Sequence, residues 1–209
     1  MRSVIWDLGG TLVDTYPDVD RALATVIDPQ PDAALLHEVA RLTRRSSSEA
    51  IDTLAACHGI PPGALRGAYE GTKRQWAEHP APAMDGAREV LDAVRAGGGL
   101  NLVATHRDRA SATALIDDLG LAVDDLVCAP DGLARKPSPE MIRTLLDRHH
   151  LNAEECLAVG DRPADVQAAR GAGVEGVLLE TPETLLDAGE ARRVSALREL
   201  LDLLDLLDR

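Results

Sequence analysis

The second half of the chain alternates short apolar runs with amphipathic stretches, and this alternation limits the folds open to it. Apolar, β-prone runs occupy residues 100–105, 125–129, 156–160 and 174–179, and segments of helical period lie between them. A similar run stands near the N-terminus at residues 3–7. Strands that alternate with helices form a parallel sheet with right-handed crossovers and helices on both faces. The sequence therefore predicts an α/β protein with a Rossmann-like, three-layer parallel sheet core.

Residues 16–80 differ from the rest of the chain because they contain no β-type run. Apolar residues recur there at spacings of three and four, and Ser46 followed by Glu49 has the pattern of a capping box. We expect about four helices in this segment. The predicted organisation is a core formed by residues 1–15 and 81–209, with residues 16–80 inserted as an α-helical cap domain.

Composition excludes several classes of partner. The formal net charge of -13 argues against nucleic acids and anionic membranes, which need clustered basic residues. The N-terminus has no long apolar run, so neither a signal peptide nor a membrane span is expected. Three scattered cysteines fit a reducing cytoplasm better than a disulfide framework. The apolar run at residues 197–207 would pack on the core or form a dimer contact, so both a monomer and a homodimer are open.

Polar residues follow the predicted strands. Asp7 ends the first run, Thr105 and His106 end the second, Lys136 comes after the third, and Asp161 follows the fourth. The carboxyl ends of parallel strands meet at one edge of a sheet, so we expect these side chains to converge. Two carboxylates can hold a divalent cation that prefers oxygen ligands. A lysine, a hydroxyl and the backbone N–H groups of a glycine turn can hold phosphate.

Four motifs in these positions resemble those of the haloacid-dehalogenase superfamily. They are DLGGTLVDT at residues 7–15, the threonine at 105, KPSPE at 136–140 and GDRPAD at 160–165. The similarity is greatest to the phosphoglycolate-phosphatase-like branch, which carries a helical cap just after the first motif. The resemblance implies a hydrolase, a phosphatase that acts on a small phosphorylated substrate with Mg²⁺ as its cofactor.

The resemblance also implies a role for each residue of the site. Asp7 would attack phosphorus and form an aspartyl-phosphate, while Thr105 and Lys136 would hold the phosphoryl oxygens. The catalytic and phosphate-binding residues would be Asp7, Gly10, Thr105, His106 and Lys136. The metal site would comprise Asp7, the backbone carbonyl of Gly9, and Asp161, with Asp165 in support.

The sequence departs from the family pattern at Gly9. The first motif is normally DxDGT, and its second aspartate protonates the leaving alkoxide and later deprotonates the attacking water. General acid/base help of this kind is worth ~10²–10⁴-fold in rate. Its loss should slow the release of alkoxides most and should lengthen the life of a phosphorylated Asp7.

Three interpretations of this departure are open. In the first, the protein is a phosphatase in which another group fills the role, and His106 is the best candidate because histidine titrates near neutrality. In the second, it resembles phosphonoacetaldehyde hydrolases, which carry a small residue here and use a cap lysine as a Schiff base; Lys73 is the only lysine in the cap segment. In the third, it is no enzyme, and it binds a phosphorylated ligand or accepts phosphate on Asp7. Haloacid dehalogenation is disfavoured, because those enzymes need no Mg²⁺ and would leave Asp161 and Asp165 without a purpose.

Overall fold

The chain forms two compact units in the computed structural model, which describes residues 2–181, 184 and 186–207. One unit consists of Asp14–Ala81, and the other combines Met1–Val13 with Pro82–Arg209.

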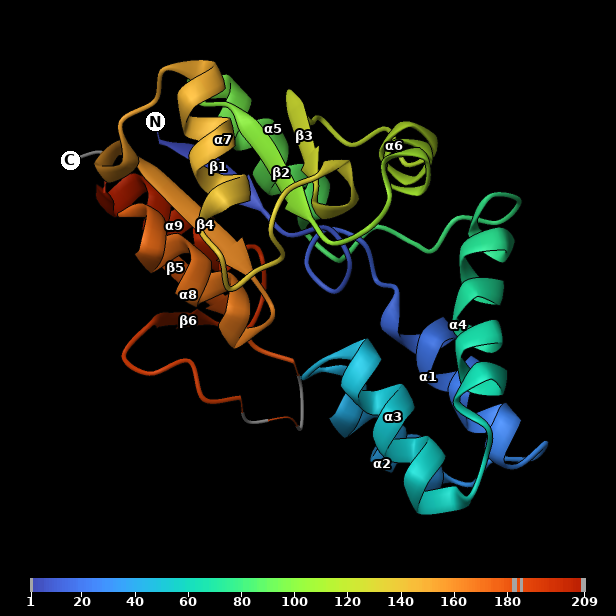
Figure 1. Ribbon diagram of the computed structural model, residues 1–209. Coiled ribbons are helices and arrows are strands. Elements are labelled where there is room, and N and C mark those ends of the chain that lie inside the picture. The colour runs from blue at the N-terminus through green and yellow to red at the C-terminus, as the bar shows by residue number, and fades with distance from the viewer. Residues whose placement is uncertain (1, 182–183, 185, 208–209) are drawn as a thin grey trace. The chain divides into compact units, whose positions relative to one another are not determined.

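A six-stranded sheet forms the centre of the larger unit (Figure 1). Every neighbouring pair of strands is parallel, in the order β3-β2-β1-β4-β5-β6. The strands are β1 (Ser3–Trp6), β2 (Asn101–Thr105), β3 (Asp125–Cys128), β4 (Cys156–Gly160), β5 (Glu175–Leu179) and β6 (Arg192–Val194). The predicted α/β, Rossmann-like fold is confirmed. The sequence pattern missed β6, because three residues of which two are arginines carry no periodic apolar signal.

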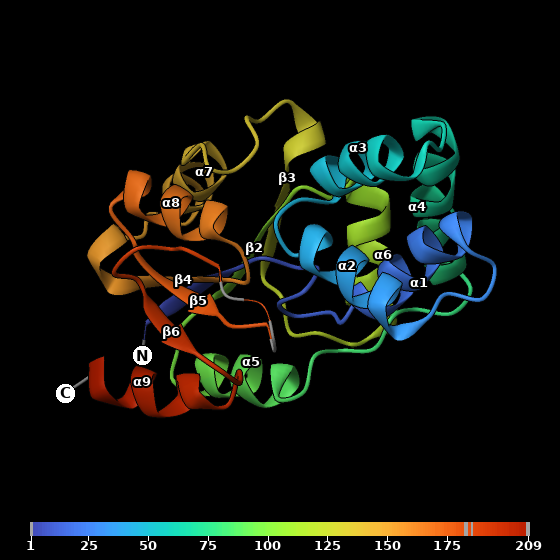
Figure 2. The same cartoon turned by 90° about the horizontal axis from the view of Figure 1, so that it is seen from below.

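Helices cover both faces of the sheet. Figure 2 shows α7 (Glu140–His149) and α8 (Pro163–Ala172) on one face, and α5 (Ala87–Ala96) and α9 (Glu199–Leu207) on the other. Helix α6 (Arg109–Asp118) and the short 3₁₀ turns η1 (Ala129–Asp131) and η2 (Ala153–Glu155) complete the unit. The core beneath α7 and α8 is a continuous apolar cluster that includes Ile5, Leu102, Ala104, Val127, Met141, Leu145, Ala158 and Ala169. Among the described residues, no helix is both long and apolar enough to cross a bilayer.

The opposite face of the sheet contains a buried hydrogen-bonded chain. Trp6 donates its indole N–H to Asn101 Oδ1 at 3.0 Å, and Asn101 donates to the carbonyl of Leu91 in α5 at 2.8 Å. A buried indole and amide are thus both satisfied, as low-dielectric interiors require. Helix α9 contacts α5 on the same side, where its Leu200 and Leu204 are buried. The apolar C-terminal run therefore packs on its own core.

The smaller unit is entirely helical over its described elements. It contains α1 (Tyr16–Ile27), α2 (Ala33–Thr43), α3 (Ser47–His58) and α4 (Pro62–Trp76). Ser46 caps α3 by accepting the backbone N–H of Glu49 at 3.3 Å. Arg44 is half-buried against α1, where it pairs with Asp20 at 2.8 Å and stacks 3.7 Å from the ring centre of Tyr16.

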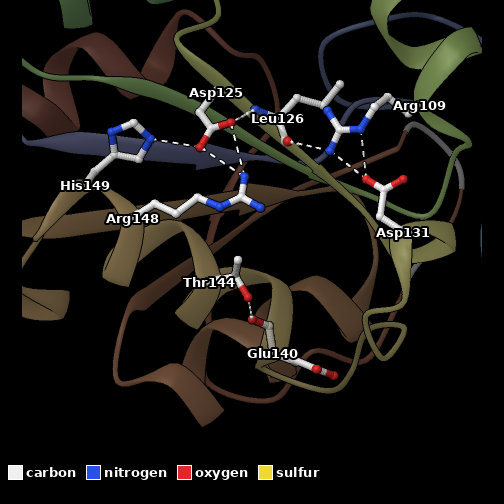
Figure 3. A network of polar contacts seen from close by, with 8 residues as sticks. All are labelled: Arg109, Asp125, Leu126, Asp131, Glu140, Thr144, Arg148 and His149. Carbon is white, nitrogen blue, oxygen red and sulfur yellow. Dashed lines mark hydrogen bonds and ion pairs between the residues drawn. The ribbon is translucent and has the colours of Figure 1, made fainter.

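A polar network fixes the outer strand β3 (Figure 3). Arg109 of α6 donates to Asp131 Oδ2 at 2.6 Å and to the carbonyl of Leu126 in β3 at 3.1 Å. Asp125, at the start of β3, contacts Nε2 of His149 in α7 at 2.9 Å. Arg109 therefore fixes the position where β3 passes into η1, and Asp125 ties the beginning of β3 to α7.

The same network holds both ends of the segment that carries Lys136. This segment runs from η1 to α7, and Asp131 and His149 in those two elements are both part of the network. Within it, Glu140 Oε2 accepts the backbone N–H of Ala134 at 2.7 Å. The loop is therefore tied down on either side of Lys136.

The other margin of the sheet is also lined by charge. Arg192 of β6 donates to Glu175 of β5 at 3.1 Å, and Arg193 donates to Glu180 at 3.2 Å. These ion pairs help to hold β6 on the sheet, because so short a strand makes few apolar contacts.

Replacing Asp125 by Asn should weaken the fold in a pH-dependent way. Burial alone would raise the pKa of Asp125, but hydrogen bonds from His149, the amide of Leu126 and Arg148 outweigh it and hold the pKa below its ordinary value. A lowered pKa means that the carboxylate stabilises the fold above the unfolded pKa of about 4 and loses this effect as pH falls through the folded value. Asp125→Asn should reduce the free energy of unfolding by about 0.5 to 1 kcal/mol at neutral pH, since solvent screens a partly exposed pair.

Urea unfolding followed from neutral pH down to about pH 3 measures this difference. Asp118→Asn is the control, because that exposed carboxylate on α6 has no partner among the described contacts. A gap between wild type and Asp125→Asn that stays constant across the range would contradict the assignment.

Candidate active site

Asp7 lies directly beyond the carboxyl end of β1. Its backbone N–H donates to the carbonyl of Val159 in β4 at 2.8 Å, which extends the pairing of the two central strands by one residue. The chain then turns through Gly10, whose φ of 91° is a left-handed conformation that favours glycine. The N–H of Gly10 donates to the carbonyl of Val13 at 2.8 Å and closes the turn. Asp7 is therefore presented at the edge of the sheet by a fixed backbone.

Lys136 is the cation of this edge. Its ammonium donates to Asp7 Oδ1 at 2.5 Å and to the carbonyl of Ala104 at 3.0 Å, and it pairs with Asp165 Oδ1 at 2.5 Å. Burial would lower the pKa of Lys136, but the carboxylates of Asp165 and Asp7 outweigh it and raise the pKa above the ordinary lysine value. The side chain thus stays charged although it is only 5% exposed.

Asp165 holds Lys136 in place. Its Oδ1 faces the ammonium, and its Oδ2 accepts the backbone N–H of Arg162 at 3.0 Å. Burial raises the pKa of Asp165, and the charge of Lys136 opposes that rise. The sequence predicted that Asp165 supports the metal, and this stays a prediction; the contact that the structure shows is with the lysine.

Gly160 makes room for this arrangement. A Cβ at Gly160 would lie 2.4 Å from both Cβ and Cγ of Asp165, far inside van der Waals contact. The glycine of the GDRPAD motif is therefore required by the close approach of the Asp165 side chain to the end of β4.

Asp161 follows β4 and is buried, with 1% of its surface exposed. Thr11 of the first motif donates its hydroxyl to Asp161 Oδ1 at 3.1 Å, which joins the loops after β1 and β4. Among the described residues there is no cluster of three or more histidine, cysteine or acidic side chains suited to a metal. Mg²⁺ in proteins commonly takes one or two carboxylates and completes its shell with waters and phosphate oxygens. The carboxylates of Asp7 and Asp161 and the carbonyl of Gly9 are oxygen donors of the kind that Mg²⁺ takes, and the predicted metal site stays a prediction.

Thr105 and His106 end β2, the neighbour of β1. Thr105 is buried, and its hydroxyl accepts the backbone N–H of Arg107 at 3.2 Å. His106 Nε2 accepts the backbone N–H of Lys136 at 2.8 Å, so the imidazole braces the loop that carries the lysine. Burial, with the charges of Lys136 and Arg135, lowers the pKa of His106 to about 3. His106 is therefore neutral at physiological pH.

The structure brings most of the predicted residues together at one edge of the larger unit. Direct contacts link Asp7, Lys136, Asp165 and His106, and another links Thr11 to Asp161. The sequence did not assign roles to Thr11 or to the Ala104 carbonyl, although Thr11 stood within the first motif. Lys73 belongs to the smaller unit, where it pairs with Glu70 on the same helix at 3.0 Å.

Three comparisons show which known proteins this chain is similar to. Residues 1–173 match the model of the haloacid dehalogenase-like hydrolases. The chain is 32% identical over 191 residues to a phosphoglycolate phosphatase of Rhodospirillum rubrum, covering 85% of this chain and 79% of that protein. It is 31% identical over 188 residues to a phosphoglycolate phosphatase of Nitrosospira multiformis, covering 83% and 80%. The crystal structure of a HAD family hydrolase from Deinococcus radiodurans, with bound phosphate and sodium, shares the fold with a TM-score of 0.82 at 22% identity, covering 100% of this chain and 96% of that one.

Gly160→Ala should disturb the site by displacing the Asp165 side chain. The added methyl group must displace Asp165, so we expect a loss of about 1–3 kcal/mol in unfolding free energy and weaker phosphatase activity. Gly67→Ala is a matched control, because a Cβ there meets nothing within 4 Å. Unfolding curves and initial rates compare the two variants. Equal effects of both would show that the space at Gly160 does not matter.

His106→Gln should leave the pH dependence of turnover unchanged between about pH 5 and pH 8. A group with a pKa of about 3 does not titrate in that range. An amide can still accept the N–H of Lys136, so the loop should keep its position. The pH–rate profiles of kcat/KM for wild type and variant test this. Loss of one limb in the variant would identify His106 as the acid or base after all.

Proposed function

Since the chain belongs to the haloacid dehalogenase-like hydrolases, we propose that it is a Mg²⁺-dependent phosphatase that acts on a small phosphorylated metabolite through Asp7. The observation that carries the proposal is the buried Lys136 ammonium, 2.5 Å from both Asp7 and Asp165. A carboxylate that attacks a dianionic phosphoryl group needs positive charge beside it to offset repulsion. The names of the relatives support a small phosphorylated compound as the substrate.

The proposed chemistry divides one displacement into two. Asp7 attacks phosphorus and the bond to the leaving oxygen breaks, which gives an aspartyl-phosphate that water then hydrolyses. Lys136 and the hydroxyl of Thr105 hold the phosphoryl oxygens, whereas the backbone N–H of Gly10 already donates to the carbonyl of Val13. Mg²⁺, when bound by Asp7, Asp161 and the Gly9 carbonyl, would neutralise charge on the phosphoryl group and polarise it.

The contacts of Lys73 and His106 bear on two of the interpretations raised by the sequence. Lys73 lies 5.2 Å from the ring centre of Tyr69 and pairs with Glu70, which is the arrangement of a charged helix-surface residue and argues against a Schiff base. His106 accepts a backbone N–H and is neutral, which argues against a general acid. The ligand-binding interpretation makes a different prediction about turnover and is decided by the first experiment below.

Asp7→Asn should abolish hydrolysis of p-nitrophenyl phosphate. Removing a nucleophile costs on the order of 10³-fold or more in rate. Asp118→Asn, purified in the same way, should keep full activity. A wild-type protein that binds phosphate esters without releasing phosphate would instead be a binding protein, and equal activity of wild type and Asp7→Asn would identify a contaminant.

Removal of divalent cations should stop turnover, and Mg²⁺ should restore it. Asp161→Asn takes away one of the two proposed carboxylate ligands, so this variant should need a higher Mg²⁺ concentration for half-maximal rate. Titrating Mg²⁺ into chelator-treated wild type, Asp161→Asn and Asp118→Asn measures the shift. Full activity of wild type in excess chelator would contradict a metal requirement.

A further inference from the structure

The ammonium that donates to Asp7 is engaged by other acceptors as well. Lys136 Nζ lies against three acceptors, namely Asp7 Oδ1, Asp165 Oδ1 and the Ala104 carbonyl. The hydroxyl of Thr11 donates to Asp161. These hydrogen bonds occupy the side-chain donors that contact Asp7 and Asp161.

His106 cannot supply a proton without breaking the loop contact. Its Nε2 accepts the N–H of Lys136 at 2.8 Å, so the ring proton of the neutral imidazole is on Nδ1. Protonating Nε2 would remove that hydrogen bond and place a second cation beside Lys136. A neutral imidazole is far too weak an acid to protonate a leaving group at neutral pH.

Gly9, two residues after the nucleophile in the first motif, offers no side chain. Gly10 has a φ of 91°, whereas Gly9 is not among the residues with positive φ. Gly9 pairs with Val13 in a short parallel bridge. The φ of Gly9 therefore does not itself require glycine, as that of Gly10 does.

We propose that the preferred substrates are acyl phosphates, whose leaving group departs as a carboxylate and needs no proton. This inference rests on the proposed function and narrows its substrate class. Asp7 attacks phosphorus, the bond from phosphorus to the acyl oxygen breaks, and its electron pair leaves on that oxygen. An alkyl phosphate would have to release an alkoxide, which is a much stronger base than a carboxylate.

The second half of the reaction also balances without a general base. Water attacks the phosphorus of the aspartyl-phosphate, the bond to Asp7 breaks, and the carboxylate is regenerated. Both protons of the water remain on the phosphate that is released. An unassisted water attacks slowly, so phosphorylated Asp7 should accumulate during turnover.

The test compares acetyl phosphate with an alkyl phosphate such as phosphoglycolate, in wild type, Gly9→Asp and Gly9→Asn. Wild type should favour acetyl phosphate in kcat/KM by on the order of 10²–10⁴-fold. Gly9→Asp should raise the value for the alkyl phosphate by about 10²-fold. Gly9→Asn matches the shape of aspartate without its acid, so it should not raise that value.

A wild-type preference below about tenfold would overturn the inference. A gain for the alkyl phosphate with Gly9→Asn equal to that with Gly9→Asp would overturn it as well. If neither variant folds, a series of aryl phosphates decides with wild type alone. A steep fall of kcat/KM with rising basicity of the leaving group supports the inference, and a flat dependence refutes it.

Failure of the proposed function would look different. Asp7→Asn serves as the blank for spontaneous hydrolysis of acetyl phosphate. If it hydrolyses acetyl phosphate as fast as wild type, the nucleophile itself is wrong, whatever the preference among leaving groups.

Discussion

A buried ammonium between two carboxylates is the interaction on which the larger unit's functional edge depends. The side chain of Lys136 is 5% exposed. An unpaired lysine buried to this degree would not stay charged, because the desolvation penalty of its ammonium is several kcal/mol. Asp7 comes from the end of β1 and Asp165 from the first turn of α8, while Lys136 sits on the loop before α7. The three segments are far apart in sequence, and their charged side chains compensate one another only when the fold brings the segments together. The network around Asp125 and Arg109 at β3 therefore serves the site indirectly, because it positions the loop that delivers the lysine.

Much of this arrangement follows from sequence because a parallel sheet has a polarity. Once residues 3–7, 100–105 and 156–160 are interpreted as parallel strands, Asp7, Thr105 and Asp161 must emerge at the same edge. The helices of the smaller unit follow from apolar spacing in the same way. The partner chosen by Asp165 could not be predicted, because spacing places it on the first turn of a helix without telling which neighbour its carboxylate faces. The hydrogen bond from Lys136 to His106 depends on the path of a loop that has no periodic pattern. Strand β6 escaped because its three residues are too few and too polar to be recognised.

Gly9 and Gly10 show how adjacent glycines can have different causes. Gly10 is required by the backbone conformation, since the turn after Asp7 needs a φ of 91° at this position. Gly9 is not among the residues with positive φ, so the cause that applies to Gly10 does not apply to it. Gly160 is a steric requirement of the Asp165 side chain, not of its own φ. Glycines of one site thus have different structural causes, since Gly10 closes a turn and Gly160 makes room for a side chain.

Both outer strands of the sheet are short and bordered by arginines. On β3 the carbonyl of Leu126 accepts a hydrogen bond from the guanidinium of Arg109. On β6, Arg192 and Arg193 are paired with acidic residues. A sheet margin with free amides and apolar side chains is a template on which another chain can add a strand. Here each edge strand has four residues or fewer and is bordered by charged side chains. These features oppose edge-to-edge pairing of the sheets of two molecules, which is the first step toward fibrillar aggregates.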